Sequence, residues 1–332
     1  GASSTQGIEA IRSLGEKKIK VIALDPKPDA LGFQSRYCNV SFVLKNDIIA
    51  SLLDLARFLK IDRSKIVLIP TGDPYAKIVS QNYSLLERFF ILTVPPWSIA
   101  KYFMDKWLTY QLALKVGIPV PKTYHPRNID ELITISKEMD FSRRWILKLL
   151  SRWTFLFGQS RIHPLFKVKA IDIHSRKTLI DISLDIKKKT GNFPVIQEVI
   201  PGKPERLYAL GVVINKNLKP VAVHTRRKIR QSPYDYGSAT FSESTWVPEA
   251  VELGLKILKA VGYYGFADVE FKEDPRDGRL KLMEVNIRLT TPISIAKKSG
   301  ADFPYILFNT FLHDSNSNAF ESKFREGVRW ID

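Results

Sequence analysis

Hydrophobic positions in the first hundred residues switch between a helical and an extended period. Gly7–Lys17 and Ile48–Leu59 carry an apolar residue every third or fourth position, as amphipathic helices do. Lys20–Leu24 and Lys65–Pro70 are short apolar runs, which predict buried strands. Strands that alternate with helices predict a parallel sheet with helices on its faces.

The middle of the chain contains one long apolar stripe. Ser98–Val116 carries aromatic and aliphatic residues three or four positions apart, which predicts a single helix, and Gly117 followed by two prolines ends it. Helix and strand signals then mix, and a strong turn signal lies at Asp274–Gly278. We expect four segments: an α/β domain at 1–97, a linking helix and loop at 98–125, a small α+β lobe at 126–203 and a second lobe at 204–332.

Acidic side chains share one face of a predicted hairpin near the C-terminal end. The strand Ala267–Lys272 alternates strictly, and a turn near residue 277 places Glu270 opposite Glu284 on the returning strand. Two like charges facing each other across a ladder are unfavourable. A divalent cation between them removes the conflict, and Asn286 adds a third hard oxygen ligand of the kind that magnesium takes.

Arg288 lies two residues beyond Asn286 on the same face, where it can meet a transferring phosphoryl group. The alternative interpretation is an ordinary solvated acidic edge of a hairpin, with Arg288 neutralising the two acids.

Several segments resemble the ATP-grasp superfamily, and they occur in that superfamily's order along nearly the whole chain. They are Asp105-Lys106 followed by Gly117–Thr123, the strand Trp145–Lys148, the segment Val195–Gly202, and the hairpin strands Val269–Lys272 and Met283–Arg288. The N-terminal βαβ region is similar to the pre-ATP-grasp domain. Within the superfamily, the resemblance is to the carboxylate–amine ligase branch, which includes D-aspartate ligase-like enzymes.

The resemblance implies an ATP-grasp fold: a pre-ATP-grasp parallel-sheet domain, a small α+β lid lobe, and an antiparallel-sheet catalytic lobe. It also implies a role for each matched residue. Lys106 and Lys148 would reach the nucleotide phosphates, the hinge Gln197, Glu198, Val199 and Ile200 would carry adenine, Glu205 would bind the ribose, and Glu270, Glu284 and Asn286 would hold Mg²⁺ or Mn²⁺. Lys148 has support from its own surroundings, because a lysine among apolar neighbours needs an anion.

The densest basic run is His224–Gln231. On a strand, Arg226, Lys228 and Arg230 would share one face. The resemblance places this strand on the acceptor side of the active site, where an arginine, for which we choose Arg230, would hold the carboxylate or acyl phosphate. A solvated basic edge and a nucleic-acid footprint remain alternatives.

One segment departs from the superfamily pattern, and one further residue is a substrate candidate. The residues after Lys148, 149–158, include a single glycine and several aromatic residues, so backbone amides cannot easily cradle phosphates there. Either Arg152 or Arg161 would substitute, or nucleotide turnover would be slow. Asp73 directly follows a predicted strand, at the edge where open α/β sheets bind ligands, and could orient a substrate amine or carboxylate.

Composition narrows the function further. The chain has 332 residues and a formal net charge of +17, which favours anionic partners. One cysteine excludes a disulfide framework, the five histidines show no metal-ligand spacing, and no apolar run reaches the length of a membrane helix. We therefore expect a cytoplasmic enzyme that uses ATP and magnesium to join a small-molecule carboxylate to an amine through an acyl phosphate, releasing ADP and phosphate.

Two other functions stay open: an ATP-grasp carboxylase that uses bicarbonate, and a catalytically weak protein that binds nucleotide or nucleic acid on the same scaffold. The sequence leaves open the identity of both substrates and the oligomeric state.

Overall fold

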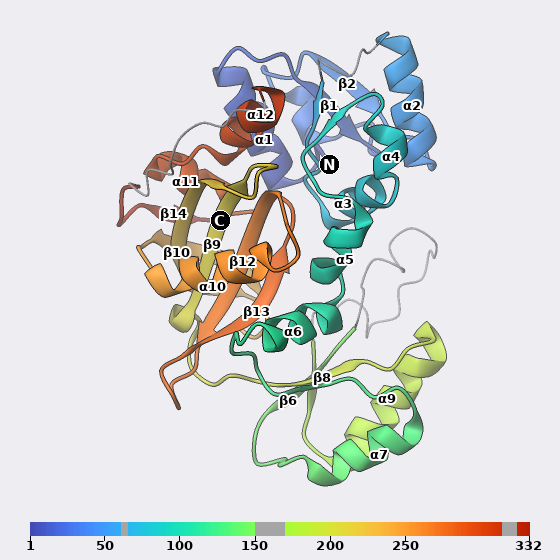
Figure 1. The fold of residues 1–332 in the computed structure, drawn as a ribbon, viewed down its shortest axis with the longest axis vertical. Coiled ribbons are helices and arrows are strands. Elements are labelled where there is room, and N and C mark those ends of the chain that lie inside the picture. Colours follow the sequence, from blue (N-terminus) through green and yellow to red (C-terminus); the bar gives the residue numbers. More distant parts are fainter. Residues whose placement is uncertain (61–65, 150–169, 314–323) are drawn as a thin grey trace.

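The structure, a computed structural model, describes residues 1–60, 66–149, 170–313 and 324–332. The N-terminal part contains two parallel strand pairs surrounded by helices (Figure 1). The pairs are β1 (Ile22–Asp25) with β2 (Val40–Val43), and β3 (Val67–Leu68) with β4 (Ile91–Leu92). The helices are α1 (Thr5–Glu16), η1 (Leu31–Gln34), α2 (Ile48–Phe58), α3 (Asp73–Gln81) and α4 (Tyr83–Leu86). The predicted helices and strands of this region are confirmed, with ends shifted by a few residues.

The predicted single helix over Ser98–Val116 is wrong. The chain forms α5 (Trp97–Met104) and α6 (Lys106–Lys115), separated by Asp105 in an extended conformation with φ −108° and ψ 118°. The Asp105 carboxylate accepts a hydrogen bond of 3.0 Å from the Leu108 N–H, so this residue caps a new helix. The apolar stripe continues across the break because α5 and α6 bury apolar side chains in the same core. The sequence pattern therefore does not reveal the break.

The lid lobe is a four-stranded antiparallel sheet covered by two helices. Its strand order is β5 (Thr123–Tyr124), β8 (Val195–Glu198), β6 (Trp145–Lys148) and β7 (Ile171–Ile173). The helices are α7 (Ile129–Glu138) and α9 (Arg176–Thr190). Apolar side chains from both layers, including Leu132, Trp145, Leu147 and Leu179, form the core of this lobe. Figure 1 shows the lobe at the bottom of the molecule.

The C-terminal lobe is a six-stranded antiparallel sheet. Its order is β13 (Leu280–Asn286), β12 (Gly265–Glu273), β9 (Leu207–Ile214), β10 (Pro220–Ser232), β11 (Ser238–Ser244) and β14 (Arg329–Ile331). The remaining elements are η3 (Pro204–Arg206), α10 (Pro248–Lys259), α11 (Ile293–Ser299) and α12 (Phe303–His313). No helix in the described ranges is long and apolar enough to cross a bilayer.

The strand β12 shows how this sheet leaves room for a site. Ala267, Val269 and Phe271 are fully buried in the core that α5, α6 and α10 form on one face. On the opposite face, Phe266 packs against Phe303 of α12, with ring centroids 5.1 Å apart. Farther along this second face, the polar side chains from Asp268 onward follow, and the sheet borders a cavity instead of a helix.

Candidate active site

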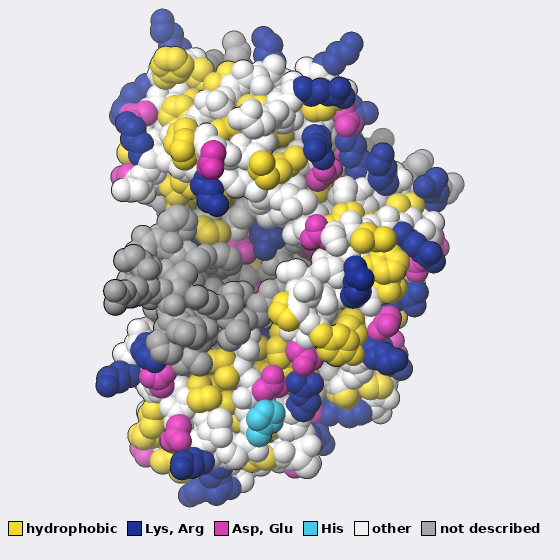
Figure 2. Space-filling view, turned by 180° about the vertical axis from the view of Figure 1, so that it is seen from behind, with side chains coloured by type: hydrophobic (Ala, Val, Ile, Leu, Met, Phe, Trp, Pro, Cys, Tyr) yellow, Lys and Arg dark blue, Asp and Glu magenta, His cyan; other side chains and the backbone are white. Residues whose placement is uncertain are grey.

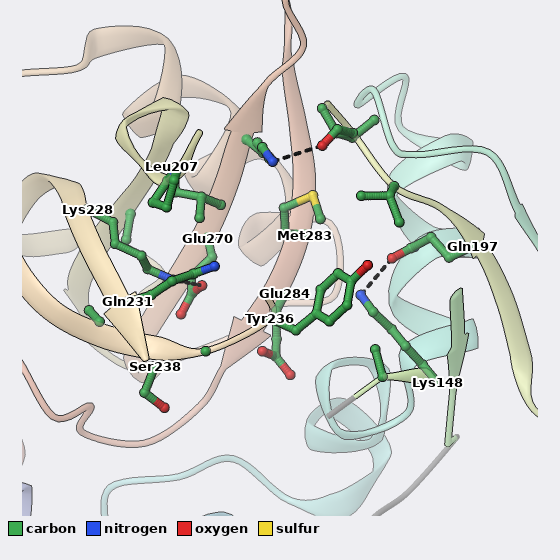
Figure 3. Close-up of a pocket in the computed structure, with 18 of the residues that line it drawn as sticks. Lys148, Gln197, Leu207, Lys228, Gln231, Tyr236, Ser238, Glu270, Met283 and Glu284 are labelled. Carbon is green, nitrogen blue, oxygen red and sulfur yellow. Dashed lines mark hydrogen bonds and ion pairs between the residues drawn. The ribbon is translucent and has the colours of Figure 1, made fainter. Parts of the chain in front are cut away.

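A cavity of about 830 Å³ lies between the lid lobe and the C-terminal sheet. Figure 3 shows that Lys148 and Gln197 reach it from the lid, while Glu270, Met283 and Glu284 reach it from the hairpin of β12 and β13. Ten of the residues predicted from the sequence line this cavity: Lys106, Lys148, Gln197, Glu198, Val199, Ile200, Glu270, Glu284, Asn286 and Arg288. The volume is that of a site for a small organic ligand.

The register predicted for the acidic hairpin is confirmed. Glu270 pairs directly with Glu284, and a β-bulge follows between Glu270 and Phe271. Each acid also faces a lysine: the Lys106 Nζ lies 2.7 Å from Glu284 Oε1, and the Lys228 Nζ lies 3.8 Å from Glu270 Oε2. These lysines reduce the repulsion between the two acids, so a cation between the carboxylates is not the sole way to relieve it.

The ion pair with Glu284 of this hairpin affects the pKa of Lys106. Burial by itself lowers the pKa of Lys106, but the charge and hydrogen bond of Glu284, with smaller contributions from Tyr110 and Asp73, raise it, and the net pKa is raised. Lys106 therefore stays charged at neutral pH, although its side chain is only 23% exposed.

The donor set on the hairpin fits a magnesium ion. Glu270 and Glu284 supply carboxylate oxygens and Asn286 an amide oxygen, all hard ligands from neighbouring positions that line one cavity. Within the residues that the structure describes, no group of three His, Cys, Asp or Glu side chains has metal-site geometry. The protein thus offers the incomplete oxygen set that suits a cation which keeps water and substrate phosphates as further ligands.

Lys148, on the lid side of the cavity, has a neutral partner. Its Nζ donates to Gln197 Oε1 over 2.6 Å (Figure 3). Gln197 is fully buried and fixed from its other end, since its Nε2 donates to Thr123 Oγ1 over 2.9 Å. An amide orients the ammonium without cancelling its charge, so the charge of Lys148 is available to an anion.

The hinge after β8 is fixed by charged side chains. The Glu198 carboxylate accepts a 3.0 Å hydrogen bond from Arg143 and a further one from Arg276. The Lys272 Nζ donates to the carbonyl oxygens of Ile200 and Gly202, each over 2.8 Å. Burial lowers the pKa of Lys272. These contacts fix the course of the hinge backbone, which lies along the cavity.

A polar cluster connects the lid lobe to the loop between β10 and β11. We call Arg144, Asp172, Asp235 and Tyr236 the lid bridge. The Arg144 Nη2 donates to Asp172 Oδ1 over 2.9 Å, and the Tyr236 hydroxyl donates to the same oxygen over 3.0 Å. Burial and the charge of Asp172 raise the pKa of Tyr236. Figure 3 shows the Tyr236 ring between the hairpin and Lys148. The lid bridge therefore crosses the cavity.

Arg288 pairs with an acid from the N-terminal part of the chain. Its Nε and Nη2 each lie 3.0 Å from one oxygen of Asp73, a side-on bidentate pair. Asp73 is the first residue of α3, and both residues line the cavity. The sequence singled out both residues but not their contact, since 215 positions separate them.

Among the predicted site residues that the structure describes, Glu205 and Arg230 do not line the cavity. Glu205 is exposed in η3. Arg230 donates to Thr240 Oγ1 over 3.1 Å on the exposed side of β10. Register shifts on both sides of Arg230 break the alternation on which the prediction depended, and Gln231 lines the cavity instead. Residues 150–158, with Arg152, and Arg161 lie outside the described residues.

Sequence reasoning missed some of the polar contacts around the cavity. The lid bridge, the two arginines on Glu198, and the 2.6 Å ion pair of Arg226 with the buried Asp268 all join distant segments. The one available signal was the position of Asp268, two residues before Glu270 on the same face of the strand.

Comparison with known proteins begins from the sequence. No family model matches the chain. The D-aspartate ligase of Enterococcus faecium strain Aus0004 is 25% identical over 248 residues, which cover 72% of this chain and 57% of the ligase. The large chain of carbamoyl phosphate synthase from Campylobacter jejuni is 21% identical over 309 residues, covering 88% of this chain and 26% of the synthase. The chain thus spans little more than half of one relative and about a quarter of the other.

Solved structures resemble the chain over almost its whole length. The biotin carboxylase domain of 2-oxoglutarate carboxylase from Hydrogenobacter thermophilus, in complex with MgADP, ADP and bicarbonate, has a TM-score of 0.73 at 14% identity, covering 96% of this chain and 70% of that one. The N5-carboxyaminoimidazole ribonucleotide synthetase of Thermus thermophilus has a TM-score of 0.71 at 14% identity, covering 98% and 80%. The chain has the ATP-grasp fold. The likeness to D-aspartate ligase agrees with the predicted carboxylate–amine ligase branch.

The ATP-grasp fold explains why the cavity lies between two antiparallel sheets. One sheet carries Lys148 and the hinge, and the other carries the acidic hairpin. The predicted fold class is confirmed.

Proposed function

We propose that this protein is an ATP-dependent carboxylate–amine ligase, which forms a carbon–nitrogen bond through an acyl phosphate and releases ADP and phosphate. One observation carries the proposal: two lysines, an acidic hairpin with Asn286, and Arg288 line a single cavity between the two sheets. The likeness to a D-aspartate ligase supports an amino acid as one of the two substrates.

The first step is phosphoryl transfer. An oxygen of the substrate carboxylate bonds to the γ-phosphorus of ATP, the bond from that phosphorus to the β,γ-bridging oxygen breaks, and ADP leaves. The protein's part is positioning and charge neutralisation. Lys148 holds the phosphates from the lid, while Lys106 and Arg288 bring positive charge to the hairpin end, where the transferring group lies.

The second step is amide formation. The amine nitrogen bonds to the acyl carbon, the bond from that carbon to the phosphate oxygen breaks, inorganic phosphate leaves, and the surplus proton of the nitrogen passes to solvent. Exclusion of water from the cavity during the reaction would protect the acyl phosphate from hydrolysis.

Magnesium, when bound by Glu270, Glu284 and Asn286, would screen the charge of the phosphates. Mn²⁺ has the same preference for oxygen ligands and is the expected substitute. Val199 and Ile200 would present backbone groups to adenine. The Val199 N–H already donates to the Arg144 carbonyl over 2.9 Å and the Ile200 carbonyl accepts from Lys272, so the Val199 carbonyl and the Ile200 N–H are the proposed contacts for the base. Glu205 and Arg230 remain proposals for ribose and acceptor contacts, and both require movement toward the cavity.

The test is an ADP-release assay with Mg·ATP, a panel of carboxylates that includes D-aspartate, and a panel of amines that includes ammonia. We expect ADP release that requires a divalent cation and one carboxylate, and amide product only with an amine present. Absence of both ADP release and a thermal shift with Mg·ATP overturns the proposal.

Two further arms separate the alternatives. Bicarbonate replaces the organic carboxylate in one arm, and bicarbonate-dependent ADP release without an amine identifies a carboxylase. RNA binding with steep salt dependence, without ADP release in any mixture, identifies a nucleic-acid-binding protein. On the face in Figure 2, Lys and Arg side chains are spread over the surface and interleaved with Asp and Glu, which does not favour a single nucleic-acid footprint there.

A further inference from the structure

The contact between Asp73 and Arg288 joins two distant parts of the chain inside the cavity. Asp73 belongs to the N-terminal part, and Arg288 follows β13 of the C-terminal sheet. Their side chains are 15% and 19% exposed, so solvent screens this pair less than a surface ion pair. A bidentate pair of this kind fixes the plane of a guanidinium as well as its position.

The geometry leaves part of the guanidinium available. Arginine has five N–H bonds. In the described part of the chain, Nε and Nη2 each donate once to Asp73, and Nη1 donates once to the Leu289 carbonyl over 3.1 Å. One N–H bond therefore remains on each of the two terminal nitrogens, and two such bonds suit the two oxygens of an oxyanion.

The charged side chains around Arg288 form two ion pairs in the cavity. Lys106 binds Glu284, Arg288 binds Asp73, and the four residues line the same cavity. Asn286 is two positions before Arg288, so an oxyanion on the free side of the guanidinium lies beside the hairpin that carries the magnesium ligands. Without Asp73, Arg288 would be free to turn toward Glu284 and leave that position.

We infer that Asp73 is a positioning residue, which holds Arg288 side-on so that the two remaining N–H bonds of the guanidinium face the oxyanion of the reaction. This inference rests on the proposed function and deepens it. The oxyanion is either the transferring phosphoryl group or the carboxylate that receives it. The acid that orients the arginine thus comes from the N-terminal part of the chain, outside the two sheets that enclose the cavity.

The experiment measures orthovanadate, a phosphoryl mimic, binding to the full chain in the presence of MgADP by calorimetry. We compare wild type with Asp73→Asn, Arg288→Lys and the double variant. Asp73→Asn should weaken vanadate binding by about 10- to 100-fold, the range found when the hydrogen-bond partner that orients a metal ligand is removed, and change MgADP affinity less than twofold. The double variant should be no weaker than Arg288→Lys, because Asp73 acts through Arg288.

Glu16→Gln is the matched control. Glu16 of α1 pairs with Lys297 of α11 over 2.6 Å, so it also joins the N-terminal part to the C-terminal lobe, but it does not line the cavity. This variant should bind MgADP and vanadate as wild type does. Thermal unfolding of every variant checks that it is folded. A second arm replaces vanadate with D-aspartate, and loss in that arm alone assigns the oxyanion as the substrate carboxylate.

The outcomes are distinguishable. Vanadate and D-aspartate affinities within twofold of wild type in Asp73→Asn, with a loss in Arg288→Lys, make the pair a structural contact and overturn the inference while leaving the proposed function intact. A wild-type chain that binds no MgADP overturns the proposed function, and the positioning role of Asp73 with it.

Discussion

The two ends of the cavity hold their lysines in different ways. At the hairpin end, Lys106 faces a carboxylate, Glu284, and its pKa is raised. At the lid end, Lys148 faces the neutral amide of Gln197. An ammonium with a neutral partner keeps its charge for a ligand, whereas an ammonium paired with an acid shares its charge with a group that can bind a metal. The difference suits phosphate binding at the lid and phosphoryl transfer at the hairpin.

The hairpin end should tolerate substitution least. Glu284→Gln removes a proposed magnesium ligand and the partner of Lys106 together, so we expect ADP release to fall by about 10²- to 10³-fold with the fold intact. Glu273→Gln, on the same hairpin but away from the cavity, is the control. Full activity of Glu284→Gln in a steady-state ADP assay would refute the metal assignment.

A substitution at the lid end should weaken ATP binding more than it slows the reaction. Lys148→Met removes the cation that the phosphates would meet, and we expect ATP to bind about 10- to 100-fold more weakly, since a charged hydrogen bond contributes roughly 1.5–3 kcal/mol. Lys122→Met makes the same change next to a lid strand, outside the cavity. Calorimetry with Mg·ATP measures both; equal affinity in the two variants would contradict the difference between the ends.

The lid bridge connects the lid lobe to the loop between β10 and β11, and breaking it should have a smaller effect. Tyr236→Phe removes the hydroxyl that donates to Asp172. A neutral-donor hydrogen bond contributes about 1 kcal/mol, so ADP should dissociate roughly fivefold faster. Stopped-flow displacement of a fluorescent ADP analogue checks this, with Tyr305→Phe on α12 as the control. An unchanged dissociation rate would mean that the bridge does not hold the lobes together.

The smallest expected effect is on the pH dependence of the free energy of unfolding. It comes from two lysines whose pKa values are shifted in opposite directions in the folded chain. The pKa of Lys272, near the hinge, is lowered by burial, and that of Lys106 is raised, from a common reference of 10.5. Just below pH 10.5, Lys272 binds more protons in the unfolded chain than in the folded chain, so the free energy of unfolding rises with pH. Above pH 10.5 the folded chain holds more protons at Lys106, so stability falls.

Denaturant titrations between pH 8.5 and 11.5 measure these slopes. We expect Lys272→Met to flatten the rising part and Lys106→Met the falling part, each by about a few tenths of a kcal/mol per pH unit, because solvent screening reduces the contribution of partly exposed groups. Parallel curves for the two variants and wild type would contradict the opposite shifts.

The sequence predicted the parts of the site that lie close together along the chain. Alternation on β12 and the turn before β13 were sufficient for the register of Glu270 with Glu284, because a short hairpin fixes its own pairing. The order of the motifs was sufficient for the fold. The contact of Asp73 with Arg288 and the lid bridge required the relative placement of elements distant in sequence, which no local pattern encodes. Arg230 shows a third limit, since a β-bulge changes which residues face the cavity without changing the composition of the strand.

The break at Asp105 also has a mechanical consequence. α5 contacts both α3 and β13, and α6 also contacts β13. If α5 and α6 were one continuous helix, they would move as a rigid body. A tilt of the first two turns would then move Lys106 away from Glu284. Asp105, in an extended conformation, separates the two helices, and its carboxylate caps the N-terminus of α6. Lys106 is therefore positioned by the start of α6, one residue after Asp105, and not by a helix that is continuous with α5.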